Sequence, residues 1–312
     1  MIGLGFAGVG WLGESLLRDL PGFPELQLIG VQDARGDLAA EIAKRYASPW
    51  HGDSFDKLLG LPGLEAVVIC TPNGLHAVQT QVALQAGKHV LVQKPLALSE
   101  ADAVATVELG RARQRLLFVD YTYRFLQTMD AFRAQLGQVL SLRATFHNIY
   151  GPGAEKTWFF DSRLSGGGAL TDLGVHLLDL GLWLVQPTDV TLVDCQLSEP
   201  GIEHAAALRL RLDDVPFDVA VSWHAAMAES QIAIEAADGR GTARWENVDG
   251  SFFHFRARRD QDVLADCETT LRVDTLRAFC AALKSGRAPP IDTRVYELLD
   301  QAYGRTASST PR

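Results

Sequence analysis

The chain has 312 residues, of which 47% are hydrophobic and 21% charged, an ordinary composition for a globular protein large enough for two domains. Its formal net charge of −9 argues against general affinity for nucleic acid or for anionic membranes. The four cysteines are scattered without a CxxC pair, so we expect reduced thiols in the cytoplasm, no disulfide framework and no metal site.

The first 120 residues alternate between strand and helix patterns. Strands are predicted at 2–7, 26–32, 66–70, 89–93 and 116–120. Helices are predicted at 11–20, 37–46 and 76–86, and after Ser99, which is a good N-cap. The apolar run Ala66–Cys70 is typical of a parallel strand buried on both faces. Residues 1–120 therefore predict a doubly wound parallel sheet of the Rossmann type. Because a buried strand begins at Ile2, we expect no signal peptide.

Residues 121–312 change character and predict a second α/β domain with a large, open, mostly antiparallel sheet. Strand patterns occur at 139–147, 190–197, 206–212, 217–223, 231–236 and 252–258. Asp238-Gly239 and Asp249-Gly250 are hairpin signals. Helices are predicted around Asp172 and at 272–284 and 295–303, and the tail 307–312 should fray. The most apolar helix, near 177–185, contains Asp179 and is too short to span a bilayer.

A glycine-rich turn follows the first predicted strand. Gly8, Gly10 and Gly13 form the pattern G-x-G-x-x-G, with Trp11 and Leu12 between them at the start of a helix. Such a turn lets a pyrophosphate approach the helix N-terminus, where N–H groups bind anions. Asp33 ends the second strand, where a carboxylate can accept hydrogen bonds from both ribose hydroxyls. This order predicts a site for NAD.

Arg35 leaves NADP possible, because a guanidinium two residues after Asp33 could bind a 2′-phosphate. A solvated loop position for Arg35 is the alternative.

Two further segments lie at predicted strand ends, where open parallel sheets bind ligands. Thr71, Pro72 and Asn73 follow one strand, with His76 soon after, and they are candidates for contacts with the cofactor. Gln93 and Lys94 follow the next strand, before a proline, and are further candidates for contacts with the cofactor. This position favours a functional role for Lys94 over an ordinary surface lysine, and Asn73 could equally be a turn or cap residue.

The segment 166–176 combines three glycines with Asp172 and His176, four residues apart on a predicted helix. Residues at this spacing share one helix face. A carboxylate beside an imidazole fixes its tautomer and stabilises its protonated form, which suits proton transfer. A buried polar pair in a helical core is the alternative.

The chain resembles the Gfo/Idh/MocA family of glucose-fructose oxidoreductases, inositol dehydrogenases and related sugar dehydrogenases. The resemblance lies in the motifs GVGWLG, TPNGLH, QKP, DYTYRF and GGGALTDLGVHLLDL, which occur in both halves. It implies NAD(P)-linked oxidation or reduction of a sugar or cyclitol by a homodimer or homotetramer, whose second domain binds substrate and supports assembly.

The resemblance also implies a catalytic set of Lys94, Asp172 and His176. His176 is the expected proton acceptor, and Asp172 either orients it or binds a neighbouring hydroxyl. Lys94 would donate a hydrogen bond to the reacting oxygen and stabilise its developing charge. Lys94 as the base remains open.

Gln93 departs from the family, which usually has Glu-Lys-Pro at this point. Glutamine keeps hydrogen-bonding capacity but removes a negative charge beside Lys94, which favours the neutral amine. A Gln93→Glu variant is expected to stay active and to move the pH–rate profile to higher pH.

Candidate substrate contacts come from two loops. Tyr123 and Arg124 follow the last strand of the first half, and Trp158, Asp161 and Arg163 precede the glycines. An aromatic side chain among charged neighbours suits a polyol. For Trp158, as for Tyr121 and Phe125, packing at a domain interface is an equal alternative.

Two other functions fit the same motifs. One is an NAD-dependent enzyme that cleaves glycosides through transient oxidation, with no net NADH. The other is a regulator that senses the cofactor without turnover, although Lys94, Asp172 and His176 would then have no use.

Overall fold

The computed structural model describes residues 1–149, 157–223 and 230–305, and the tail expected to fray lies outside them. The chain forms two compact units. The first contains Met1–Asp120 and Arg272–Ile291, and the second contains Tyr121–Leu271 and the chain from Asp292 onward. Residues 272–291, which lie within the predicted second domain 121–312, thus pack with the first unit.

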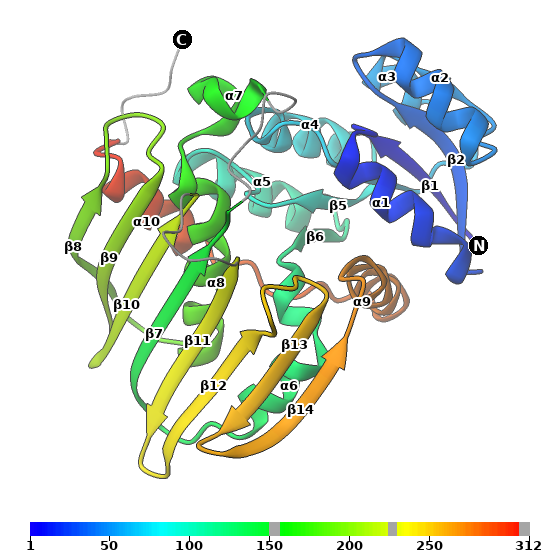
Figure 1. Ribbon diagram of the computed structural model, residues 1–312. Helices are drawn as coiled ribbons and strands as arrows, with labels where there is room; N and C mark the ends of the chain where they lie inside the picture. Colours follow the sequence, from blue (N-terminus) through cyan, green and yellow to red (C-terminus); the bar gives the residue numbers. More distant parts are fainter. Residues whose placement is uncertain (150–156, 224–229, 306–312) are drawn as a thin grey trace. The chain divides into compact units, whose positions relative to one another are not determined.

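The first unit is built on a six-stranded sheet in the order β3-β2-β1-β4-β5-β6 (Figure 1). All neighbouring strands of this sheet pair in parallel. The strands are β1 (Ile2–Ala7), β2 (Leu26–Gln32), β3 (His51–Gly52), β4 (Ala66–Ile69), β5 (His89–Gln93) and β6 (Leu117–Asp120). Because the order reverses between β1 and β4, a ligand crevice is expected at the carboxyl ends of these strands.

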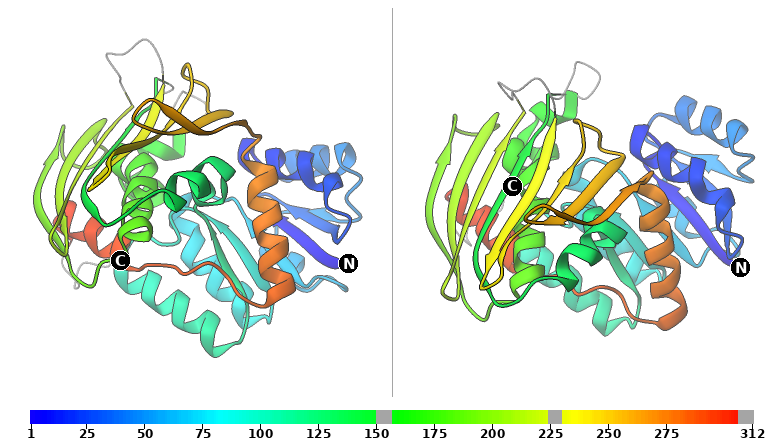
Figure 2. Two further views of the ribbon diagram at one scale, coloured as in Figure 1. Left: turned by 90° about the horizontal axis from the view of Figure 1, so that it is seen from below. Right: turned by 60° about the horizontal axis from the view of Figure 1, so that its bottom comes forward.

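Six α-helices belong to the first unit among the residues described. They are α1 (Trp11–Asp19), α2 (Gly36–Arg45), α3 (Phe55–Leu59), α4 (Asn73–Gln85), α5 (Glu100–Ala112) and α9 (Arg272–Ser285), with a 3₁₀ turn at Leu20–Gly22. Ser99 caps α5 as predicted, by accepting from the Asp102 N–H. Helix α9 packs beside α1 (Figure 2), and its Phe279 meets Phe118 of β6 edge-to-face at 5.6 Å.

The second unit is built on an eight-stranded sheet in the order β14-β13-β12-β11-β7-β10-β9-β8 (Figure 1). The strands are β7 (Val139–His147), β8 (Val190–Leu197), β9 (Ala205–Leu212), β10 (Val215–Ser222), β11 (Gln231–Asp238), β12 (Gly241–Asn247), β13 (His254–Arg259) and β14 (Asp262–Glu268). Strands β7 and β10 pair in parallel, and the other neighbouring strands of this sheet pair antiparallel. Buried and exposed residues alternate along β9, so one face of the sheet meets the core.

Helices α6 (Gln127–Ala134), α8 (Val175–Val185) and α10 (Arg294–Ala302) pack against this sheet. Short helical turns cover Thr122–Phe125, Thr157–Phe160 and α7 (Ser162–Ser165), and a π-helical turn at Leu170–Gly174 leads into α8. The fold class predicted from the sequence is confirmed: a Rossmann-type parallel sheet plus a mostly antiparallel sheet.

One helical stretch, Ser162–Val185, has 24 residues and is long and apolar enough to cross a membrane by length and composition. The expectation that the helix is too short was therefore wrong, because helical structure begins well before Leu177. However, 78% of its apolar window is buried inside the fold, as in the core helix of a globular domain.

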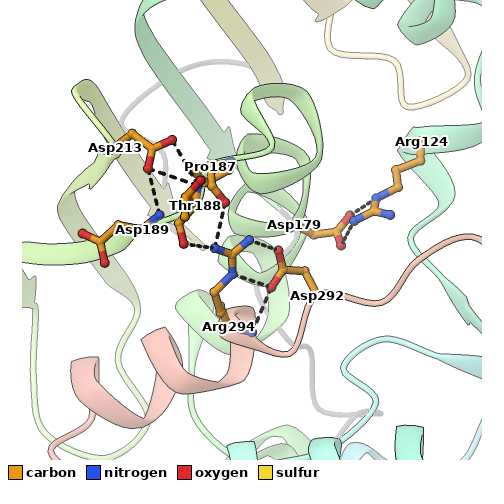
Figure 3. A network of polar contacts seen from close by, with 8 residues as sticks. All are labelled: Arg124, Asp179, Pro187, Thr188, Asp189, Asp213, Asp292 and Arg294. Carbon is orange, nitrogen blue, oxygen red and sulfur yellow. Dashed lines mark hydrogen bonds and ion pairs between the residues drawn. The ribbon is translucent and has the colours of Figure 1, made fainter.

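An ion pair lies inside this helix packing. Arg124 Nε donates to Asp179 Oδ2 at 2.6 Å, and both side chains are almost fully buried (Figure 3). Burial, opposed by Arg124 and assisted by Asp292, raises the pKa of Asp179 to about 7. Figure 3 also shows Arg294 bound to Asp292 and to the carbonyls of Pro187 and Thr188, which ties the start of α10 to the end of α8.

Candidate active site

Each of the three glycines in the first turn lacks a side chain for a different structural reason. Gly8 has a φ of +80°, and a Cβ there would lie 2.7 Å from the backbone of Cys70. A Cβ on Gly13 would lie 2.1 Å from the Gly8 carbonyl oxygen, so the start of α1 packs closely on the turn. A Cβ on Gly10 would meet only an Arg35 nitrogen, at 3.9 Å, so the absent side chain leaves open space there. These features fit a turn that holds a pyrophosphate at the N-terminus of α1.

Asp33 holds the glycine turn. Its Oδ2 accepts from the Val9 N–H at 3.0 Å, and its Oδ1 accepts from the Arg35 N–H at 3.0 Å. The Arg35 guanidinium folds back toward the same carboxylate, with Nε at 3.4 Å, and reaches the space over Gly10. Asp33 and Arg35 therefore both border the position expected for the ribose, and the side chain of Arg35 is largely exposed.

His76 connects the loops that follow β4 and β5. Its ring nitrogens lie 2.7 Å from the carbonyl oxygens of Pro95 and Thr71. Burial lowers the pKa of His76 to about 4, although the two carbonyls favour the protonated ring. Since the ring is 1% exposed, His76 braces the turn that carries Lys94. Thr71 donates to Gln79, and Asn73 begins α4 as a buried residue.

Lys94 follows β5, and its neighbour Gln93 binds a carboxylate that the sequence patterns did not indicate. Gln93 and Asp120 are register partners on β5 and β6. Gln93 Nε2 donates to Asp120 Oδ2 at 2.6 Å, and both residues are buried. Thr275 of α9 donates to the other oxygen at 2.8 Å. The carboxyl ends of β1, β2, β5 and β6 thus carry the glycine turn, Asp33, Lys94 and Asp120.

In the second unit, the glycine segment packs on Glu203 and Tyr303. Glu203 is fully buried and accepts from the N–H groups of Gly168 at 3.0 Å and Leu170 at 2.7 Å. Tyr303 donates to the same carboxylate at 2.9 Å and lies 3.0 Å from the hydroxyl of Thr171. Burial raises the pKa of Glu203. This carboxylate therefore anchors the start of the helix that carries Asp172 and His176.

Asp172 and His176 each have a neighbour that the sequence did not indicate. Trp223 Nε1 donates to Asp172 Oδ2 at 3.0 Å. The ring of His176 meets that of Tyr123 edge-to-face, with centroids 4.9 Å apart. Because Asp172 lies in the π-helical turn and His176 in α8, their angular relation differs from that of a continuous α-helix. Asp172 is half-buried and His176 is 8% exposed.

The predicted substrate residues fall into two groups. Tyr123 and Arg124 are 6% exposed and belong to the interior of the second unit, where Arg124 pairs with Asp179. Trp158 is half-buried against Phe159, whereas Asp161 and Arg163 form an exposed ion pair at the start of α7. Only the second group presents polar groups to solvent.

Four residues of this arrangement were absent from the sequence prediction: Asp120, Glu203, Trp223 and Tyr303. Asp120 could have been found, because an acid that ends a buried strand next to Gln93 is a detectable signal. The other three lie far along the chain from the residues that they bind. Among the residues that the structure describes, no group of three or more His, Cys, Asp or Glu side chains could hold a metal ion.

The chain matches two domain families. Residues 2–121 match the oxidoreductase family with an NAD-binding Rossmann fold, and residues 133–242 match the GFO/IDH/MocA C-terminal domain.

Named relatives match part of their length. A levoglucosan dehydrogenase from Pseudarthrobacter phenanthrenivorans is 28% identical over 172 residues, which cover 53% of this chain and 44% of that protein. A D-glucoside 3-dehydrogenase from Escherichia coli is 30% identical over 169 residues, covering 52% of this chain and 47% of that protein. The chain thus matches less than half the length of these relatives.

Solved structures share the fold over nearly the whole chain. A levoglucosan dehydrogenase in complex with NADH and levoglucosan has a TM-score of 0.82 at 19% identity and covers 97% of each chain. A 3-ketoreductase from Actinomadura kijaniata, in complex with NADP and TDP-benzene, has a TM-score of 0.80 at 21% identity, covering 96% of this chain and 94% of that one. With both of its domains matched by the family, the chain belongs to the Gfo/Idh/MocA family of oxidoreductases.

Proposed function

We propose that the protein is an NAD(P)-dependent oxidoreductase that transfers a hydride between nicotinamide and a hydroxyl-bearing carbon of a sugar, sugar derivative or cyclitol. The observation that carries this proposal is one edge of the first unit's sheet, where the glycine turn, Asp33 and Lys94 follow the strands β1, β2 and β5. Relatives named as dehydrogenases of levoglucosan and D-glucosides support a sugar as substrate.

The residues around the glycine turn would hold the cofactor. The N–H groups of Trp11 and Leu12 would bind the pyrophosphate, and Asp33 would accept from the ribose hydroxyls. The carboxylate favours NAD, while Arg35 makes NADP acceptable because its guanidinium already reaches the space over Gly10. A nicotinamide held there would supply the acceptor or donor of the hydride.

Lys94, Asp172 and His176 would handle the proton of the substrate hydroxyl. His176 accepts it, and Lys94 donates a hydrogen bond to the oxygen as negative charge develops there. Asp172, held by the Trp223 indole, binds a neighbouring hydroxyl or orients His176. Trp158, Asp161 and Arg163 would contact the rest of the sugar, with an apolar ring face against the indole.

We further propose that the second unit, Tyr121–Leu271 and the chain from Asp292 onward, forms the substrate-binding and oligomerisation domain of a cytoplasmic homodimer or homotetramer. The support is the open sheet of the second unit, where exposed and buried residues alternate along β9.

A screen of sugars and cyclitols with NAD and with NADP, followed at 340 nm, tests the proposal. Net formation of NADH or NADPH on a free polyol is expected, and His176→Ala should lose most turnover while it still binds cofactor. Glycoside cleavage without net NADH would instead identify the transient-oxidation enzyme. Tight cofactor binding without turnover on any compound would identify a sensor, and full activity of His176→Ala would refute the role of that residue.

A further inference from the structure

A buried carboxylate is hydrogen-bonded to Gln93, the residue before the lysine of the proposed active site. Asp120 ends β6, is 1% exposed, and receives one hydrogen bond on each oxygen. Gln93 Nε2 donates to Oδ2 at 2.6 Å, and Thr275 Oγ1 donates to Oδ1 at 2.8 Å. Donors on both oxygens favour the ionised form of the carboxyl group.

The charged and titratable groups around Asp120 come from three places in the first unit. Lys94 follows β5 and Arg272 begins α9, and both cations stabilise the carboxylate. Cys70, which follows β4, is the other titratable neighbour, and burial together with Asp120 keeps its thiol protonated. Arg272 is also held by Ser15 of α1, since its Nε donates to Oγ at 3.2 Å. Burial raises the pKa of Asp120, while the two cations and two donors oppose that rise.

The identity of residue 93 follows from this contact. A glutamate there would bring two carboxylates to the 2.6 Å separation of a hydrogen bond, so the pair would have to share a proton. Glutamine has nearly the same shape and donates an N–H instead. Gln93 and Asp120 therefore form one unit with a single negative charge, located on β6 rather than at residue 93.

We propose that Asp120 is a positioning residue for Lys94, which supplies from the neighbouring strand the negative charge that a glutamate before the lysine usually supplies in this family. The expected kinetic effect rests on the proposed function, whereas the effect of Asp120 on the charge of Lys94 does not.

Charge relocation tests the proposal. Asp120→Asn removes the charge and keeps the shape, because the Gln93 amide can turn over to accept from the new amide while Thr275 still donates. The limb of the pH–rate profile that reports Lys94 should then move to lower pH by about one unit, whether lysine acts as base or as hydrogen-bond donor. The double variant Gln93→Glu/Asp120→Asn returns the charge to residue 93 and should restore the limb to within a few tenths of a unit.

A second variant keeps the test independent of how Asp120→Asn folds. In Gln93→Glu alone, the two carboxylates should share one proton, so the limb should stay close to that of the wild type. The contact with Asp120 thus replaces the shift to higher pH that the sequence alone predicts for this variant. The control is Glu108→Gln, an exposed carboxylate on α5 of the same unit, which should leave the profile unchanged. An unchanged limb in Asp120→Asn, no restoration in the double variant, or a full-unit alkaline shift in Gln93→Glu would each overturn the proposal.

A readout without turnover separates this inference from the proposed function. If the wild type oxidises no sugar or cyclitol, the reactivity of the Lys94 amine toward acetic anhydride can be followed by mass spectrometry across pH in the same variants. The midpoint for Lys94 should move to lower pH in Asp120→Asn and return in the double variant. An identical midpoint in all of them would refute the role of Asp120, whatever reaction the protein catalyses.

Discussion

The indole of Trp223 is the neighbour that holds the carboxylate of Asp172, through a hydrogen bond of 3.0 Å. Trp223→Phe removes this donor and keeps an aromatic ring. We expect kcat to fall at least about 10-fold, because a hydrogen bond to a charged group contributes about 1.5–3 kcal/mol, while cofactor affinity stays unchanged. Steady-state kinetics and a cofactor titration check this expectation.

Trp245→Phe is the matched control. Trp245 is also fully buried, and its Nε1 donates at 2.9 Å to the hydroxyl of Thr128 rather than to Asp172. The two variants should lose similar stability in thermal unfolding, with the smaller loss of kcat in Trp245→Phe. Equal losses of kcat would show that packing, and not the contact with Asp172, limits the reaction.

Cofactor choice depends on Asp33 and Arg35 at the residue scale. Asp33→Ser keeps an acceptor for the Val9 N–H but removes the charge that would repel a 2′-phosphate. The ratio of NADP to NAD affinity should rise at least about 10-fold, whereas Arg35→Ala should lower NADP affinity and spare NAD. Isothermal titration with both cofactors measures the ratio. An unchanged ratio in both variants would mean that the 2′-phosphate of NADP does not lie beside Asp33 and Arg35.

At the scale of elements, the glycine segment before α8 depends on a close contact with the β8–β9 connection. A Cβ on Gly168 would lie 1.9 Å from the Glu203 carbonyl oxygen, and backbone atoms cannot give way cheaply. Gly168→Ala should therefore destabilise the protein by about 3 kcal/mol or more, as measured by urea unfolding. Gly239→Ala is the control, since nothing lies within 4 Å of a Cβ there, and its effect should be below about 1 kcal/mol. Similar losses of stability in the two variants would contradict the close contact between Gly168 and Glu203.

Helix α8 carries a buried acid whose protonation should make stability depend on pH. The pKa of Asp179 is about 7 in the folded protein, against 3.8 as the ordinary value, so folding takes up a proton between these limits. The contribution of this group therefore lowers the free energy of unfolding as pH rises from about 4 to about 7, by at most about 1.4 kcal/mol per pH unit.

Asp179→Asn removes this titration. Urea unfolding at several pH values between 5 and 7 should show a flatter dependence in the variant than in the wild type. The stability deficit of the variant should therefore narrow as pH rises. Parallel curves would mean that Arg124 keeps Asp179 ionised throughout this range.

For the whole molecule, the alternation of strands and helices predicted the first sheet, and successive strand patterns with hairpin signals predicted most of the second. The predicted strands 26–32, 89–93, 139–147 and 190–197 have the same bounds in the structure. Strands β12 and β14 were missed because charged side chains such as Arg244, Glu246 and Asp266 obscure their apolar alternation. The return of α9 to the first unit was also missed, because an amphipathic pattern does not indicate which core covers its apolar face.

The part of the candidate site that lies at the ends of the parallel strands could be predicted from the sequence. Asp33 and Lys94 follow parallel strands, so their common edge follows from the strand pattern. The contacts of Glu203, Trp223 and Tyr303 were not predictable, since they join residues 35, 51 and 132 positions apart in the chain. Such contacts depend on strand order and register in the second sheet, which local patterns do not specify.

Hydride transfer itself can be followed with a label. Hexoses and cyclitols deuterated at every ring carbon are incubated with NAD or NADP and the protein, and the reduced cofactor is analysed by mass spectrometry. The proposed function predicts one deuterium on the cofactor, and a Lys94→Ala variant that binds cofactor but transfers the label at least about 100-fold more slowly. Absence of deuterium on the cofactor while the sugar is consumed, or equal transfer by Lys94→Ala, would contradict the account.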